Sequence, residues 1–396
     1  MSDNGGNGRE PGFLPGRRSL LASAAGAAGA AALGPLAQTG GAGEGADRPN
    51  ILLIETDDHR WDALGCMGNT VIKTPNLDRL AERGVVFHDM VCQGSMCLPS
   101  RTSLLTGSYP HNTGIYTNRD RPDEFYDWTF PNALRRAGYR TASIGKNHFM
   151  LPYRFDDYRS DRAHKGWKKY GFDHIHAIGG KVNTPRGWHD GPYRQYLRDK
   201  GLLKAVKQDY KKNRDGPLYG YVGPSPLPVK HYQDSYIGRK AAEWVDAYSR
   251  PNPFFLWLDF VAPHLPCDAP EPYASLYDPA TMPMPPQDDL SDMPNYLGNK
   301  AEKQSRYAAE QHLRKVKAGY YGMVSLMDKW VGRLLDALEA NGRLENTLII
   351  FLGDQGQMLG DHGMFGKGEF YRGSIGAPLV ISYPRAFKKE AHVRQP

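Results

Sequence analysis

Two short apolar segments, far apart in the chain, are each followed closely by acidic residues. Residues Asn50–Thr56 precede Asp57 and Asp58, and residues 347–352 come just before Asp354. Nearly continuous apolar runs of this length are typical of strands buried on both faces of a parallel sheet. Because ligands bind beyond the carboxyl ends of such strands, we expect the two acidic clusters to meet at one edge of a sheet.

Strand and helix signals alternate along the chain. A helical period covers residues 306–340 and ends before Gly342, and residues 378–382 form a third apolar run. Such alternation predicts an α/β sandwich with a central, mostly parallel sheet flanked by helices. The aromatic-rich polar stretch 153–236 shows no strong period, which indicates loops with short helices that often set specificity above strand ends.

The acidic clusters offer a set of oxygen ligands. Asp57, Asp58, Asp354 and the amide of Gln355 provide the donors that a hard divalent cation prefers and that zinc does not. An isolated acid after a strand more often caps a helix or closes a turn. Two clusters at two strand ends favour a shared metal site.

A distinctive motif lies at residues 97–101, which read Cys-Leu-Pro-Ser-Arg and precede Thr-Ser-Leu-Leu-Thr-Gly. Pro99 fits the first position of a short helix, and Gly107 fits its left-handed end. Cys97 would then lie at a helix N-terminus, where exposed N–H groups favour an anion. For a lone cysteine the usual alternative is a small buried hydrophobe.

This motif resembles the signature of the sulfatase family, within the alkaline phosphatase superfamily. In that family a formylglycine-generating enzyme oxidises the cysteine to formylglycine, an aldehyde whose hydrate is the nucleophile. The resemblance implies that Cys97 becomes formylglycine and that Arg101 holds the hydrated aldehyde. It also implies that residue 97 and the four oxygen donors bind Ca²⁺, or Mg²⁺ in its place. Gln355 differs from the family's usual His or Asn.

Further short motifs follow in the family's order between residues 145 and 368. The resemblance implies that Lys146 and His148 contact the sulfate and the leaving-group side, that His264 faces the substrate and that Lys367 bridges to sulfate. A lone histidine is more often structural, and a lysine usually solvates a surface. Their fixed order around the signature makes them a candidate catalytic set.

The reaction implied by the resemblance is hydrolysis of sulfate monoesters by an arylsulfatase-like, carbohydrate or choline sulfatase. One hydroxyl of the hydrate attacks sulfur, a histidine protonates the departing oxygen, and the second hydroxyl expels sulfate. One alternative is a phosphonate monoester or phosphodiester hydrolase with the same apparatus. Another is a non-catalytic exported binding protein or a truncated fragment.

The first 46 residues are expected to form a twin-arginine-type signal and a disordered tail. Arg17 and Arg18 precede an Ala/Gly-rich apolar stretch that is too short and too rich in small residues for a comfortable membrane span. This predicts export by the twin-arginine machinery to the bacterial periplasm or exterior. Residues 47–396 are expected to form the catalytic domain, without the smaller C-terminal subdomain usual in the family.

The net charge and the number of cysteines limit the partners and the kind of fold that this protein can have. The formal net charge of +7 can steer anionic substrates, although it is also compatible with a merely solvated surface. The sequence has no Lys/Arg-rich run or nucleic-acid motif, so we discount a nucleic-acid partner. Four cysteines are too few for a disulfide scaffold.

Overall fold

The computed structural model describes residues 48–120, 126, 128–148, 157–213, 217–288 and 291–394. These residues belong to the second of two units into which the chain divides, Arg48–Pro396. The signal expected within residues 1–46 therefore lies outside the described residues. Within the described ranges, no helix is both long and apolar enough to cross a bilayer.

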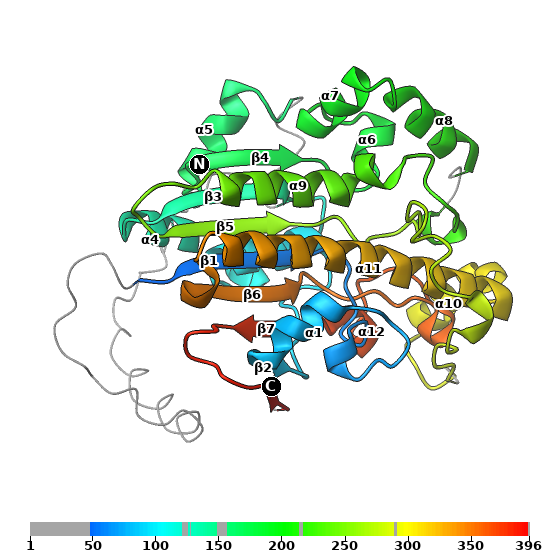
Figure 1. Ribbon diagram of the computed structural model, residues 1–396. Helices are drawn as coiled ribbons and strands as arrows, with labels where there is room; N and C mark the ends of the chain where they lie inside the picture. The colour runs from blue at the N-terminus through cyan, green and yellow to red at the C-terminus, as the bar shows by residue number, and fades with distance from the viewer. Residues whose placement is uncertain are drawn as a thin grey trace, which may run out of the picture. The chain divides into compact units, whose positions relative to one another are not determined.

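The central sheet has eight strands in the order β4-β3-β5-β1-β6-β7-β2-β8 (Figure 1). The first five are mutually parallel, β7 is antiparallel to both of its neighbours, and β8 pairs in parallel with β2. The expected α/β sandwich with a mostly parallel sheet is therefore confirmed. The strands are β1 Asn50–Thr56, β2 Gly84–Phe87, β3 Arg140–Lys146, β4 His174–Ile178, β5 Phe254–Asp259, β6 Thr347–Gly353, β7 Leu379–Ser382 and β8 Ala391–Val393.

Helices cover both faces of this sheet. They are α1 Pro75–Glu82, α2 Cys97–Thr106, α3 Pro110–Thr113, α4 Phe130–Arg136, α5 Asp161–Lys169, α6 Asn183–Arg186, α7 Pro192–Asp199, α8 Leu203–Asn213, α9 Gln233–Asp246, α10 Asn295–Gln304, α11 Glu310–Ala340 and α12 Arg372–Ile375. Helices α9 and α11 lie side by side over one face (Figure 1), and α2 and α4 lie over the other.

The alternation of side chains along β1 divides the core into two layers. Leu52 and Ile54 pack with Val324 of α11 in one buried apolar cluster. Leu53 points the other way and packs with Leu105 of α2 in a second cluster. Because successive residues of a strand face opposite sides, an apolar run buried on both faces produces this three-layer arrangement.

The main sequence-derived elements agree with the structure, with small shifts at their ends. β1 matches the predicted strand residue for residue, and β6 extends the second run by one residue to Gly353. The long helix begins at Glu310 rather than residue 306, because Ala309 has an extended backbone (φ −58°, ψ 132°). The third run forms β7, which turns out to be antiparallel to β6.

The start of α2 differs from the expectation. The helix begins at Cys97, after an extended Met96, so Pro99 is its third residue rather than its first. The first N–H groups of a helix have no intrahelical acceptor, so a proline, which lacks an N–H, costs little there. Gly107 ends the helix with φ 64°, as its left-handed role predicted.

The expectation of loops and short helices for residues 153–236 is partly wrong. Helices α5 to α8 are short, but the same stretch also contains β4, an edge strand paired with β3. β4 reads His-Ile-His-Ala-Ile, a short segment whose apolar content is too low to indicate a strand without its partner. Its position extends the parallel sheet beside the strand that ends in Lys146.

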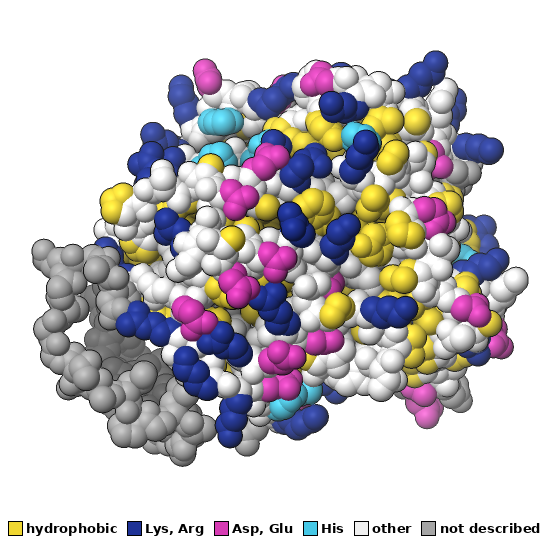
Figure 2. All heavy atoms as spheres, viewed as in Figure 1, with side chains coloured by type: hydrophobic (Ala, Val, Ile, Leu, Met, Phe, Trp, Pro, Cys, Tyr) yellow, Lys and Arg dark blue, Asp and Glu magenta, His cyan; other side chains and the backbone are white. Residues whose placement is uncertain are grey.

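Surface charges of both signs are spread over the face shown in Figure 2, where Lys and Arg side chains lie among Asp and Glu. Most charged groups of the predicted site are instead buried near the carboxyl ends of the parallel strands, and Lys367 is partly buried.

Candidate active site

The acidic residues predicted at two strand ends lie next to one another. β1 and β6 are neighbours, with Thr56 paired to Gly353. Asp57 and Asp354, which follow these residues, are buried, and the backbone N–H of Asp58 donates to the Asp354 carboxylate at 2.9 Å. The strand register therefore brings both acidic clusters to one point at the carboxyl edge of the sheet.

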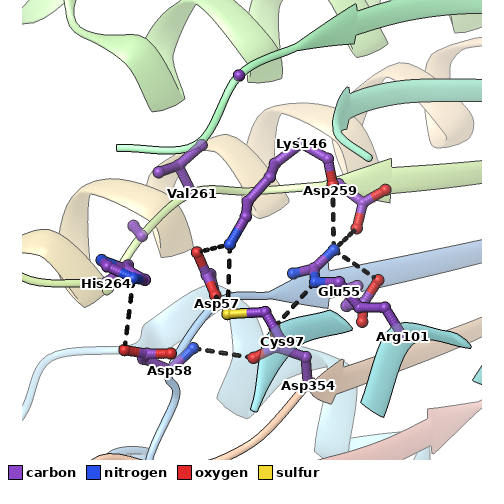
Figure 3. Close-up of polar contacts among 12 residues, drawn as sticks. Glu55, Asp57, Asp58, Cys97, Arg101, Lys146, Asp259, Val261, His264 and Asp354 are labelled. Atoms are coloured by element: carbon purple, nitrogen blue, oxygen red, sulfur yellow. Dashed lines mark hydrogen bonds and ion pairs between the residues drawn. The ribbon is translucent and has the colours of Figure 1, made fainter. Parts of the chain in front are cut away.

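Cys97, the first residue of α2, lies against these carboxylates (Figure 3). Its Sγ is 3.2 Å from Asp57 Oδ1, 3.6 Å from Lys146 Nζ and 2.8 Å from Lys367 Nζ. Burial, and then the charge of Asp57, raise the pKa of the Cys97 thiol to about 12, although both lysines oppose the shift. At neutral pH an unmodified Cys97 is thus a protonated thiol, which is a much weaker nucleophile than a thiolate.

The two predicted lysines approach the sulfur from different elements. Lys146 ends β3 and pairs with Asp57, whereas Lys367 follows β6 in the chain and pairs with Asp58. Burial alone would lower the pKa of each ammonium, but the neighbouring carboxylates outweigh it and hold each pKa above its usual value. Two persistent positive charges therefore flank residue 97.

The two predicted histidines lie on the open side of this cluster. His264 Nδ1 is 2.6 Å from the Leu265 carbonyl oxygen, and its Nε2 is 3.8 Å from Asp58 Oδ2. Because a carbonyl can only accept a hydrogen bond, the Nδ1 of His264 carries a proton. Burial lowers the pKa of both His264 and His148, so both imidazoles are neutral at pH 7.

The guanidinium of Arg101 is fully buried beside the cluster, among Asp354, Glu55 and Asp259 (Figure 3). Its Nε donates to Asp354 at 2.8 Å, and its Nη1 donates to Glu55 at 3.0 Å and to Asp259 at 2.6 Å. Nη2 has no hydrogen-bond partner among the described residues. The three carboxylates therefore fix the orientation of Arg101 and leave one nitrogen of its guanidinium without a protein acceptor.

The sequence analysis missed Glu55 and Asp259 in this network. They are paired in register on β1 and β5 and are fully buried, and the Trp257 indole donates to Glu55 at 2.9 Å. Burial raises the pKa of both carboxyl groups. Glu55 interrupts an apolar strand and Asp259 ends the run 254–258. A buried carboxylate needs a partner, so this pattern was a usable signal for a buried cation.

A compact group of side chains can hold a metal ion. Asp57, Asp58, Cys97 and His264 each offer one ligand atom, and these atoms lie within 4.8 Å of one another. The Gln355 amide is adjacent, because its Nε2 donates to Asp58 Oδ1 at 2.5 Å. The amide oxygen of Gln355 is buried and has no partner in the described part of the chain. His264, which the sequence analysis assigned to the substrate, thus also lies in this group.

Asp354 has less free coordination capacity than the sequence suggests. Its Oδ1 accepts from the backbone N–H groups of Asp58 and Gln355 at 2.9 and 2.8 Å, and its Oδ2 accepts from Arg101. Since each carboxylate oxygen has two lone pairs, Oδ2 retains one for a cation. Carboxylate oxygens together with an unpartnered amide oxygen fit a hard cation such as Ca²⁺ or Mg²⁺.

A pocket of about 620 Å³, its open mouth included, adjoins this cluster. Its lining includes Cys97, Lys146, His148 and His264, and also the segment between residues 178 and 189. Cys97 and Lys146 are buried, whereas Trp188 of that segment is half-exposed and marks the outer part of the pocket. The structure thus brings the predicted nucleophile, one predicted lysine and both histidines to a single cavity, with Lys367 in contact with the same sulfur.

The sequence profile of the family described as Sulfatase matches residues 49–396 of this chain. The chain belongs to the sulfatase family. This sulfatase is 30% identical over 349 residues to the arylsulfatase of Clostridium perfringens, an alignment that covers 85% of this chain and 69% of that protein.

Two further comparisons bear on this sulfatase. It is 29% identical over 379 residues to the N-acetylglucosamine-6-O-sulfatase of Bacteroides thetaiotaomicron, covering 86% of this chain and 64% of that one. The crystal structure of the phosphonate monoester hydrolase of Agrobacterium radiobacter matches with a TM-score of 0.68 and 25% identity, covering 88% of this chain and 71% of that one. The chain therefore spans about two thirds of the length of these relatives.

Proposed function

We propose that this chain hydrolyses sulfate monoesters with residue 97 as the nucleophile. The observation that carries the proposal is the surrounding of Cys97 Sγ, which two lysine ammonium groups and the Asp57 carboxylate contact at the inner end of a pocket. A sulfuryl group carries negative charge on its oxygens, and fixed cations stabilise that charge as it redistributes during transfer.

Conversion of Cys97 to formylglycine would supply what the thiol lacks. A thiol has a single nucleophilic atom, so it could attack sulfur but could not expel sulfate from the ester that it forms. The hydrate of formylglycine supplies two hydroxyl groups, one to attack sulfur and one to expel sulfate afterwards. A formylglycine-generating enzyme is therefore a proposed partner of this chain.

The other site residues have separate roles in this proposal. Lys146 and Lys367 would bind the sulfuryl oxygens once a divalent cation balances Asp57 and Asp58, with which the lysines now pair. His264 or His148 would protonate the leaving oxygen. Both are neutral at pH 7, and the negative charge of a bound sulfate ester would raise the pKa of either imidazole toward the protonated form.

The cation would be held by Asp57, Asp58, Asp354 and Gln355, together with residue 97. When bound, Ca²⁺ or Mg²⁺ would make a coordinated hydroxyl more acidic and balance charge on the sulfuryl group. The side-chain amide of Gln355 supports this assignment. Its Nε2 contacts Asp58 and Cys97, and a 180° rotation of the amide would turn its unpartnered oxygen toward the same group.

Comparison of two esters with the same leaving group tests the reaction class. We expect a higher kcat/KM for 4-nitrophenyl sulfate than for a 4-nitrophenyl phosphonate monoester, measured on protein produced with a formylglycine-generating enzyme. The likeness to a phosphonate monoester hydrolase at 25% identity makes the second ester the relevant competitor. A larger kcat/KM for the phosphonate would favour that activity instead. Absence of turnover on both of these esters and on choline and sugar sulfates would favour a non-catalytic binding protein.

A further inference from the structure

We propose that the outer part of the pocket binds a sugar, so that the substrate is a sulfated carbohydrate rather than an aryl or choline sulfate. This inference rests on the proposed sulfate ester hydrolysis. The pocket runs from Cys97 and Lys146 to the segment at residues 178–189, and Trp188 and His189 line it there. We place the alcohol part of an ester whose sulfuryl group contacts Cys97 against this segment.

Trp188 offers a rigid aromatic surface to such a ligand. Its side chain is 51% exposed although it lines a pocket. The Arg186 guanidinium carbon lies 4.8 Å from the centre of the indole, and Arg186 Nε donates to Tyr210 Oη at 2.8 Å. The indole is thus held in place by its neighbours. The C–H groups of a pyranose ring pack well on such a surface, which buries apolar area and leaves the sugar hydroxyls free.

Two buried polar atoms in the pocket lining favour a leaving group that carries hydroxyls. Asn147 Oδ1 and His148 Nδ1 have no hydrogen-bond partner among the described residues. The amide nitrogen of Asn147 donates to Asp259 and Ser143, so its oxygen is oriented away from them. An aryl ring offers these two side chains no hydrogen bond, whereas sugar hydroxyls can both donate and accept. Sites that hydrogen-bond a hydroxyl reject analogues lacking it strongly.

The charges around the outer pocket argue against choline. Among the described residues, the pocket lining contains two lysines and no Asp or Glu. Lys181 pairs with Asp268 at 2.6 Å, so its charge is balanced. Trp188, the half-exposed aromatic side chain, already has the Arg186 guanidinium beside its ring, and this positive charge would repel a quaternary ammonium group. A neutral or anionic sugar meets no such repulsion.

A substrate panel tests the chemical class. The converted enzyme is assayed with 4-nitrophenyl sulfate, choline sulfate, and a set of monosaccharides and disaccharides that carry sulfate at different hydroxyls. We expect the best sugar sulfate to have the highest kcat/KM of the panel. A higher kcat/KM for the aryl or choline ester than for every sugar sulfate would overturn the inference but leave the proposed function intact. If no sulfate ester is turned over, both the inference of a sugar substrate and the proposed sulfate ester hydrolysis are wrong.

A matched pair of tryptophan variants tests the location. In Trp188→Ala, KM for the best sugar sulfate should rise by on the order of tenfold with little change in kcat, the size expected for loss of an aromatic contact. Trp188→Phe should restore part of the affinity. Trp128→Ala is the control, because Trp128 is also 51% exposed but is not among the residues that line the pocket. Equal KM values for the Trp188→Ala and Trp128→Ala enzymes would overturn the assignment of the sugar site.

Discussion

The variant Cys97→Ser is expected to stop after one turnover with sulfate bound covalently to the serine. The serine hydroxyl can attack sulfur between the same two lysines, so the first ester bond can form. It has no second hydroxyl to expel the sulfate, so the enzyme cannot regenerate. Rapid-quench kinetics should show a burst equal to the enzyme concentration, and intact-mass analysis should show one added sulfuryl group.

Cys97→Ala is the matched control for this prediction. It removes the nucleophile and should show neither a burst nor turnover. Its fold should persist, because the loss of one sulfur atom removes little core volume, and thermal unfolding followed by circular dichroism can verify this. Repeated turnover by an unconverted serine variant would contradict the role assigned to the two hydroxyls.

Asp57→Ala is expected to abolish both cation binding and turnover. Asp57 is fully buried, contacts Cys97 Sγ at 3.2 Å and pairs with Lys146. Its loss would remove a proposed ligand and leave a buried ammonium unpaired. We expect kcat/KM to fall by more than about a hundredfold, because even outer-shell partners of metal ligands cost about 10- to 100-fold. Titration calorimetry with Ca²⁺ and an ester assay measure the two effects.

Two further variants and a chelator make this test specific. Asp336→Asn changes an exposed carboxylate that pairs with Arg79 and should leave both calcium affinity and turnover unchanged. Gln355→Asn keeps an amide oxygen with a shorter reach and should retain substantial activity.

Chelation of the wild-type enzyme should stop turnover, and addition of Ca²⁺ or Mg²⁺ should restore it. Undiminished activity after chelation, or in the Asp57→Ala variant, would show that the proposed metal has no role in turnover.

Local sequence patterns were sufficient to predict the two strands and the short helix that position the site. The apolar runs that became β1 and β6 each end in acids, and parallel pairing in register necessarily places those acids together. The signature at residues 97–101 predicted a short helix with Cys97 beside its N-terminus and Gly107 at its end, and the observed helix begins two residues before Pro99, at Cys97 itself. These features depend on neighbours in sequence or on one strand pairing, so the sequence carries them directly.

The contacts that hold Arg101 and His264 in place join segments that are distant in sequence, and the sequence analysis did not predict them. Glu55 on β1 and Asp259 on β5 pair with Arg101 together with Asp354, which follows β6. Asp354 was predicted only as a metal ligand, and Glu55 and Asp259 each look like an ordinary acid when taken alone. His264 was predicted to face the substrate, but its approach to Asp58 was not predicted, because it follows from the path of the loop after β5. Burial decides the charge state of such groups, and burial is known only once the layers are assembled.

The mass of the tryptic peptide that spans residues 84–101 tests the central claim most directly. This peptide contains Cys92 as well as Cys97, and both are free thiols in the structure, so Cys92 serves as an internal control. After coexpression with a formylglycine-generating enzyme and alkylation, the peptide should carry one alkylated cysteine, at 92. Residue 97 should carry an aldehyde that reacts with a hydrazide. Two alkylated cysteines in a preparation that turns over sulfate esters would contradict the formylglycine mechanism.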